Sequence, residues 1–79
     1  MFALCKYRET DEYHVFETVK NADKCTYKSS MSICGAVETK DVGNCVAVCT
    51  SAKEIQTKAP KIGDTVCGNC MKIIYKTED

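Results

Sequence analysis

The sequence predicts a small metal-stabilised β-rich (α+β) domain, in which antiparallel strands are accompanied by one short helix. The chain has 79 residues and seven cysteines, several segments are rich in β-forming residues, and Cys67 and Cys70 form a C-x2-C pair. A chain of this length makes one domain, residues 1–79, and buries only about 60% of the surface that its unfolded form exposes. Such a core supplies at most about 3–5 kcal/mol, so we expect a metal or disulfides to add to it.

The first half of the chain is predicted to form strands separated by turns. Residues 2–8 are predicted to form a strand, and residues 13–20 are rich in β-forming side chains. A turn at residues 10–12 joins the two into a hairpin, and a second turn occupies residues 21–24. Residues 25–34 then alternate between apolar and polar side chains, which predicts a half-buried strand.

The second half of the chain is predicted to contain the helix and one more strand. Apolar residues recur at helical spacing over residues 44–59, and Pro60 is expected to stop the helix there. The run at residues 46–50 also suits a strand, although we favour the helix. Residues 73–76 are predicted to form a short final strand.

The charges of the chain balance, with 11 Lys and Arg against 11 Asp and Glu. Nucleic-acid-binding proteins usually carry a basic patch, because their affinity comes largely from neutralised phosphates. The balanced charge therefore does not favour nucleic-acid binding.

The sequence has no glycine-rich phosphate loop and no third residue that would orient a Cys–His nucleophile pair. We therefore expect a protein that is not an enzyme.

The compartment is inferred from the N-terminus and from the cysteine count. The apolar run at the N-terminus is too short for an export signal, and no stretch approaches the ~20 apolar residues that span a membrane. An odd number of cysteines leaves at least one thiol unpaired within the chain. We expect a cytoplasmic protein with reduced thiols, and a secreted disulfide-rich effector is the alternative.

The C-x2-C pair at Cys67 and Cys70 predicts half of a tetrahedral metal site. Two thiolates three positions apart bind one ion only if the chain between them turns sharply, and Gly68 and Asn69 both tolerate such a turn. A redox-active C-x2-C normally opens a helix after a strand. The strand-like residues that follow this pair therefore favour metal binding.

Residues 63–70 and the strand-like residues 71–74 resemble the second knuckle of the zinc ribbons found in general transcription factors. The shared pattern is Gly-Asp, an aliphatic residue, C-x2-C and a strand. Those ribbons usually place a glycine directly after the second cysteine, where this chain has Met71. The resemblance implies a zinc-ribbon-like fold and a zinc half-site on Cys67 and Cys70; it carries over no role in transcription.

We expect His14 and Cys34 to complete the metal site. Cys34 ends a predicted strand just before Gly35, and His14, the only histidine, lies on a neighbouring predicted strand. The order of an early His, a lone Cys-Gly and a late C-x2-C is also similar to that of small single-zinc proteins of bacteria and their viruses.

An alternative pair is Cys45 and Cys49, which form a C-x3-C motif 17 residues before Cys67, as far apart as the two knuckles of a ribbon. On a helix, positions i and i+4 share a face and can bind one ion. A set that includes Cys5 or Cys25 also stays open, although we expect cysteines outside the site to be small buried apolar residues.

Zinc is the expected ion, because thiolates with an imidazole suit it and four protein ligands leave no position open for catalysis. Iron would require an all-thiolate set. In finger peptides structural zinc contributes on the order of 10–16 kcal/mol. These considerations predict a structural-zinc protein that binds another protein and no membrane. The alternative is a nucleic-acid-binding protein whose phosphate contacts come from five lysines: Lys53, Lys58, Lys61, Lys72 and Lys76.

Overall fold

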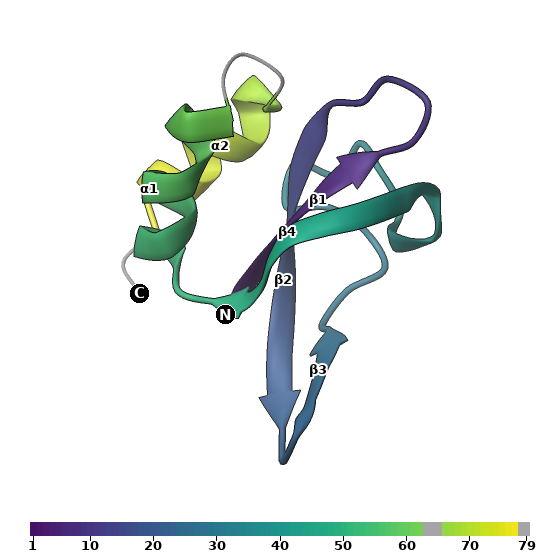
Figure 1. Cartoon of the computed structure of the whole chain (residues 1–79), viewed down its shortest axis with the longest axis vertical. Helices are drawn as coiled ribbons and strands as arrows, with labels where there is room; N and C mark the ends of the chain where they lie inside the picture. The colour runs from purple at the N-terminus through teal and green to yellow at the C-terminus, as the bar shows by residue number, and fades with distance from the viewer. Residues whose placement is uncertain (63–65, 78–79) are drawn as a thin grey trace.

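The computed structural model of the chain describes residues 1–62 and 66–77. Its centre is a curled antiparallel sheet with the strand order β3-β2-β1-β4, and two helices pack on one side of it (Figure 1). The strands are β1 (Phe2–Tyr7), β2 (Tyr13–Asn21), β3 (Lys24–Tyr27) and β4 (Val42–Thr50). The predicted hairpin of the first two strands is confirmed, with Cys5 opposite His14.

The predicted strand over residues 25–34 is only partly right, because β3 ends at Tyr27. The backbone then leaves the sheet, and residues 28–38 contribute only an isolated bridge between Met31 and Glu38. The hydroxyl of Ser29 accepts a hydrogen bond from the backbone N–H of Met31, at 3.2 Å. Such local bonds compete with a strand ladder, so residues 28–34 of the alternating pattern form a loop instead.

The helix predicted over residues 44–59 divides into a strand and a helix. β4 reaches Thr50, and α1 (Ala52–Ile62) begins after Ser51, whose hydroxyl accepts a hydrogen bond from the backbone N–H of Glu54. Pairing with β1 favours the extended form for β4, which is rich in valine. The helical prediction is therefore right only for the second half of the segment.

Pro60 lies inside α1 instead of stopping the helix. A proline at this position leaves the carbonyl of Gln56, four residues earlier, without its helical donor. The hydroxyl of Tyr75 donates to that carbonyl at 3.4 Å. A contact with another helix thus replaces part of what the proline removes.

The strand predicted over residues 73–76 is wrong, because α2 (Gly68–Tyr75) is a helix. Cys70 and Ile74 lie one helical turn apart and are both fully buried, so a helix places both on the core side. With α1, α2 and a short 3-10 helix at Thr39–Asp41, the expectation of one short helix is also wrong. Where the zinc-ribbon resemblance implied a strand, this chain has a helix.

The apolar core has two parts, one on each face of the sheet. Between the sheet and the helices lie nine buried residues: Phe2, Leu4, Val15, Ala47, Ala52, Ile55, Cys67, Cys70 and Ile74. On the opposite face a smaller group is buried: Ala3, Cys5, Phe16, Val37 and Val42. The alternation along β1 explains the division, because successive strand residues point to opposite faces.

Two disulfides tie the sheet together. Cys5–Cys45 links β1 to β4, and Cys25–Cys49 links the two edge strands β3 and β4. Irregularities in the pairing of β1 with β4 indicate bulges, which increase the twist of a sheet. The curl brings the edges within reach of the second disulfide. The expectation that these four cysteines are reduced is therefore wrong for this structure.

Among the described residues, no helix is long and apolar enough to cross a membrane.

Candidate metal centre

Four side chains converge at the edge of β2: His14, Cys34, Cys67 and Cys70. One ligand atom from each lies within 4.8 Å of all the others. Nδ1 of His14 is 3.6 Å from Sγ of Cys34 and 3.7 Å from Sγ of Cys70. Sγ of Cys67 is 3.9 Å from Sγ of Cys34. These are the four residues that the sequence placed first.

These distances match the dimensions of a tetrahedral zinc site. With Zn–S bonds of about 2.3 Å and a Zn–N bond of about 2.1 Å, sulfurs lie about 3.8 Å apart and the nitrogen about 3.6 Å from each sulfur. The observed separations of 3.6, 3.7 and 3.9 Å differ from these values by at most about 0.1 Å. Because all six pairs of ligand atoms lie within 4.8 Å, these residues could hold a metal ion after at most a small movement.

The backbone of β2 holds the other three ligand segments in place. β3 pairs with β2 only from Thr18 onward, so the edge at residues 13–15 is open to other partners. The carbonyl of Tyr13 accepts from the N–H of Cys67, and the carbonyl of Val15 accepts from the N–H of Ile33, both at 2.8 Å. The open edge thus binds both the loop before Cys34 and the start of α2.

Cys67 and Cys70 lie at the N-terminal end of α2. Cys67 is the N-cap residue, and its carbonyl accepts the N–H of Met71, so the expected tight turn is the first turn of a helix. The positive end of the helix dipole favours thiolates at this position. A strand after the pair would argue against a redox-active dithiol, but a helix follows it. The evidence for a metal site therefore comes from His14 and Cys34, which lie beside the two thiols.

Glu12 orients His14. Oε1 of Glu12 lies 2.9 Å from Nε2 of His14, whose side chain is only 3% exposed. A carboxylate that accepts the Nε2 proton leaves the Nδ1 lone pair free, and metal-binding histidines commonly have such a partner. Sequence reasoning missed Glu12. The signal was its spacing, because residues i and i+2 of an extended chain share a face.

Ser32 was missed as well. Its hydroxyl lies 3.1 Å from Sγ of Cys34 and accepts the N–H of Val37. Burial alone raises the pKa of the Cys34 thiol, but hydrogen bonds from Ser32, the backbone of Ala36 and His14 outweigh burial and lower this pKa to about 6. Cys34 is therefore ready to bind a cation as a thiolate.

Cys70 shows the opposite shift. Burial raises the pKa of its thiol far above the ordinary value, Cys34 and Cys67 raise it further, and the backbone N–H of Val15 acts in the opposite direction. In the metal-free centre, burial and the neighbouring sulfurs thus disfavour the thiolate form of Cys70. A divalent cation reverses this preference, since a coordinating thiol is deprotonated by the ion itself.

The other candidate residues do not reach the centre. Cys45 and Cys49, the alternative ligand pair, are each bonded in a disulfide, to Cys5 and Cys25 respectively. That alternative is wrong for this structure, as is any set that includes the two partners. The five candidate lysines all belong to the helical side of the molecule, with Lys53, Lys58 and Lys61 on α1, Lys72 on α2 and Lys76 at its C-cap.

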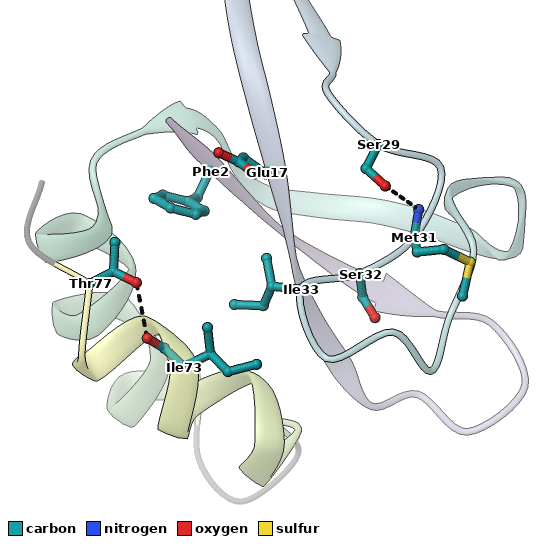
Figure 2. Close-up of a pocket in the computed structure, with 8 residues that line it drawn as sticks. All are labelled: Phe2, Glu17, Ser29, Met31, Ser32, Ile33, Ile73 and Thr77. Carbon is teal, nitrogen blue, oxygen red and sulfur yellow. Dashed lines mark hydrogen bonds between the residues drawn. The ribbon is translucent and has the colours of Figure 1, made fainter.

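A groove of about 380 Å³ lies beside the metal centre. Figure 2 shows Phe2, Ile33 and Ile73 facing one another across it, with Thr77 just beyond the C-terminal end of α2 and Ser32 on the opposite loop. Ser32 is the residue that contacts Cys34, and Ile33 precedes Cys34 in the chain. The groove and the metal centre therefore share one loop.

The chain was compared with known proteins in three ways. No protein-family model, no curated protein and no solved structure matches it.

Proposed function

We propose that this chain is a structural-zinc protein that acts as a protein-interaction module. The spacing of the four ligand atoms, which fits tetrahedral zinc, supports the proposal most. A His ligand is incompatible with an all-thiolate iron centre and suits zinc. Four protein ligands leave no coordination position for a substrate, so the ion has a structural and not a catalytic role.

The position of the centre explains what the ion stabilises. His14 belongs to β2, Cys34 to the loop after β3, and the remaining pair to α2. One ion thus joins three segments that are far apart in sequence. The loop and α2 both line the groove, together with Phe2 and Glu17 of the sheet, so the ion also fixes the shape of the surface that we propose for the partner.

Exposed apolar side chains on α2 support the interaction role. Ile73 borders the groove and is 41% exposed, and Tyr75 is 54% exposed. Ile73 joins Phe2 and Ile33 in lining the groove, and apolar residues that gather in this way commonly mark a binding surface. The groove is also small, which suits one or two side chains of a partner segment.

Panning a random peptide library on phage against the zinc-loaded protein tests this proposal. We expect enriched peptides that bind the native chain and lose affinity for Ile73→Glu, whereas the matched variant Val48→Glu on the far β4 strand keeps it. Absence of any enriched sequence, or equal binding to both variants, would overturn the groove as a docking surface.

The five lysines favour nucleic-acid binding as the second candidate function. They lie on the helical side, and within residues 1–62 and 66–77 none of them forms an ion pair. The zero net charge speaks against this candidate. Titrating generic single- and double-stranded DNA at several salt concentrations distinguishes the two: submicromolar affinity with a steep salt dependence would favour nucleic acid.

The two disulfides bear on the compartment. Disulfides persist mainly where conditions are oxidising and are rare in the cytosol. Cys5–Cys45 and Cys25–Cys49 therefore favour an exported protein over the cytoplasmic prediction, in line with the secreted alternative. Thiols counted in denaturant with chelator and without reductant decide it: three favour an oxidising compartment, and seven favour the cytoplasm.

A further inference from the structure

We propose that the metal centre is also an oxidation site, at which a peroxide converts Cys34 and Cys67 into a third disulfide and thereby releases the ion. The inference rests on the proposed function, because it concerns the regulation of the same centre. All three free cysteines of the described residues lie in this centre, since the other four are already paired, and the proposed disulfide uses two of the three.

The pair is chosen by proximity. Sγ of Cys34 and Sγ of Cys67 lie 3.9 Å apart. A disulfide requires a separation of about 2.05 Å, so the two sulfurs must approach by roughly 1.9 Å. Rotation of the two side chains and a small shift of the loop that carries Cys34 supply a movement of this size.

Differences in exposure decide which thiol reacts first. Cys34 is half-buried and lies in a turn beside Gly35, whose φ is +76°, whereas Cys67 and Cys70 are buried. A small oxidant therefore reaches Cys34 before the other two. No strand or helix of the described residues includes Cys34, so a shift of its sulfur breaks no helix and no strand ladder.

Cys70 is the less suitable partner for Cys34. Its side chain is fully buried inside α2, and its sulfur accepts the backbone N–H of Val15 at 3.4 Å. Moving this sulfur would break that contact and disturb the helix. Cys67 stands at the N-cap, where the chain enters α2, and moves at a smaller cost.

The chemistry balances with a peroxide as the oxidant. The Cys34 sulfur attacks one peroxide oxygen, so an S–O bond forms, the O–O bond breaks and the leaving oxygen departs as water. The Cys67 sulfur then attacks the Cys34 sulfur, which forms the S–S bond and expels the second oxygen as water. The two zinc-bound thiolates give two electrons, solvent supplies the two protons that complete the two water molecules, and the centre keeps only His14 and Cys70 as ligands.

The test uses the full chain with both existing disulfides intact and without reductant. Zinc stoichiometry is first measured by native mass spectrometry. Hydrogen peroxide is then titrated in while a chromophoric chelator reports released zinc, and the linkages are mapped by proteolysis and mass spectrometry. We expect one zinc released per peroxide consumed, free thiols falling from three to one, and a peptide that joins Cys34 to Cys67.

Two variants separate the inference from the proposed function. Cys70→Ser, studied without metal, should still form the Cys34–Cys67 link, whereas Cys34→Ser should form no third disulfide at the same peroxide dose. A link that includes Cys70, or sulfinic acid without a link, would overturn the inference even if zinc binds. Failure to bind zinc, with the link still formed, would instead overturn the proposed function and the release step. Circular dichroism of each variant confirms that it is folded.

Discussion

The backbone N–H of Val15 donates a hydrogen bond to Sγ of Cys70 across 3.4 Å, although the two residues are 55 positions apart. Val15 packs in the core below α2, and Cys70 is a candidate metal ligand. The contact therefore joins the sheet, the helix and the metal centre at one point. N–H groups that point at ligand sulfurs are a common outer layer of metal sites, because they stabilise the negative charge.

Removing the metal should lower the thermal stability substantially without abolishing the fold. An ion present at a thousand times its dissociation constant stabilises the folded state by about 4 kcal/mol. For a domain of this size we expect chelation to lower Tm by about 15–30 °C. Because the two disulfides lie outside the centre, the metal-free chain should keep a cooperative transition in calorimetry. A transition that does not move on chelation would contradict the structural role of the ion.

Glu12→Gln should weaken metal binding by about 10–100-fold, because it removes the carboxylate that orients His14. The measurement is a competition titration against a chelator of known affinity. Glu54→Gln, an exposed glutamate on α1, is the matched control and should leave the affinity unchanged. Equal affinities for the native chain and Glu12→Gln would show that His14 needs no partner.

Cys34 should react with iodoacetamide at a lower pH than an ordinary cysteine when the protein is metal-free. The thiolate is the reactive form. With a pKa of about 6, the Cys34 rate should rise as pH increases through 6 and become constant near neutral pH. Mass spectrometry of the Cys34 peptide gives the profile.

Two comparisons test the cause of that shift. Ser32→Ala should move the midpoint to higher pH, because the Ser32 hydroxyl is the largest of the contacts that lower the pKa of Cys34. The Cys70 peptide should stay unmodified at neutral pH, since burial raises the pKa of its thiol. A Cys34 midpoint near pH 9 would contradict the assignment.

Replacing both Cys25 and Cys49 by Ala should destabilise the protein by about 3–4 kcal/mol. The bond links residues 24 positions apart, and loop entropy in the unfolded chain sets a cost of this size. Urea unfolding with zinc held constant measures the change. Zinc affinity should remain as in the native chain, because neither cysteine belongs to the centre. A change below about 1 kcal/mol would indicate that the edge strands need no covalent link.

Local patterns were enough to predict the hairpin and to select the residues of the centre. The β-forming segments on both sides of residues 10–12 form β1 and β2, because each strand needs only its neighbour to pair. The chemistry of His14, Cys34, Cys67 and Cys70 suggested one set of ligands, and their ligand atoms do converge. Whether they hold zinc stays a prediction.

The remaining features depended on contacts that a pattern does not contain. Residues 46–50 carry apolar side chains at a spacing that suits a helix or a strand, and the open edge of β1 decided for the strand. Near the C-terminus, the helical conformation of α2 is favoured because it buries both Cys70 and Ile74 in the apolar core.

By itself, the sequence determined which residue types were present to crosslink so short a chain, and which segments prefer to be extended. Only the tertiary structure decided how the seven cysteines divide, with four in disulfides and three beside His14. The physical reason is distance: any two thiols can bond or share an ion in principle, and the curl of the sheet selects which of them meet.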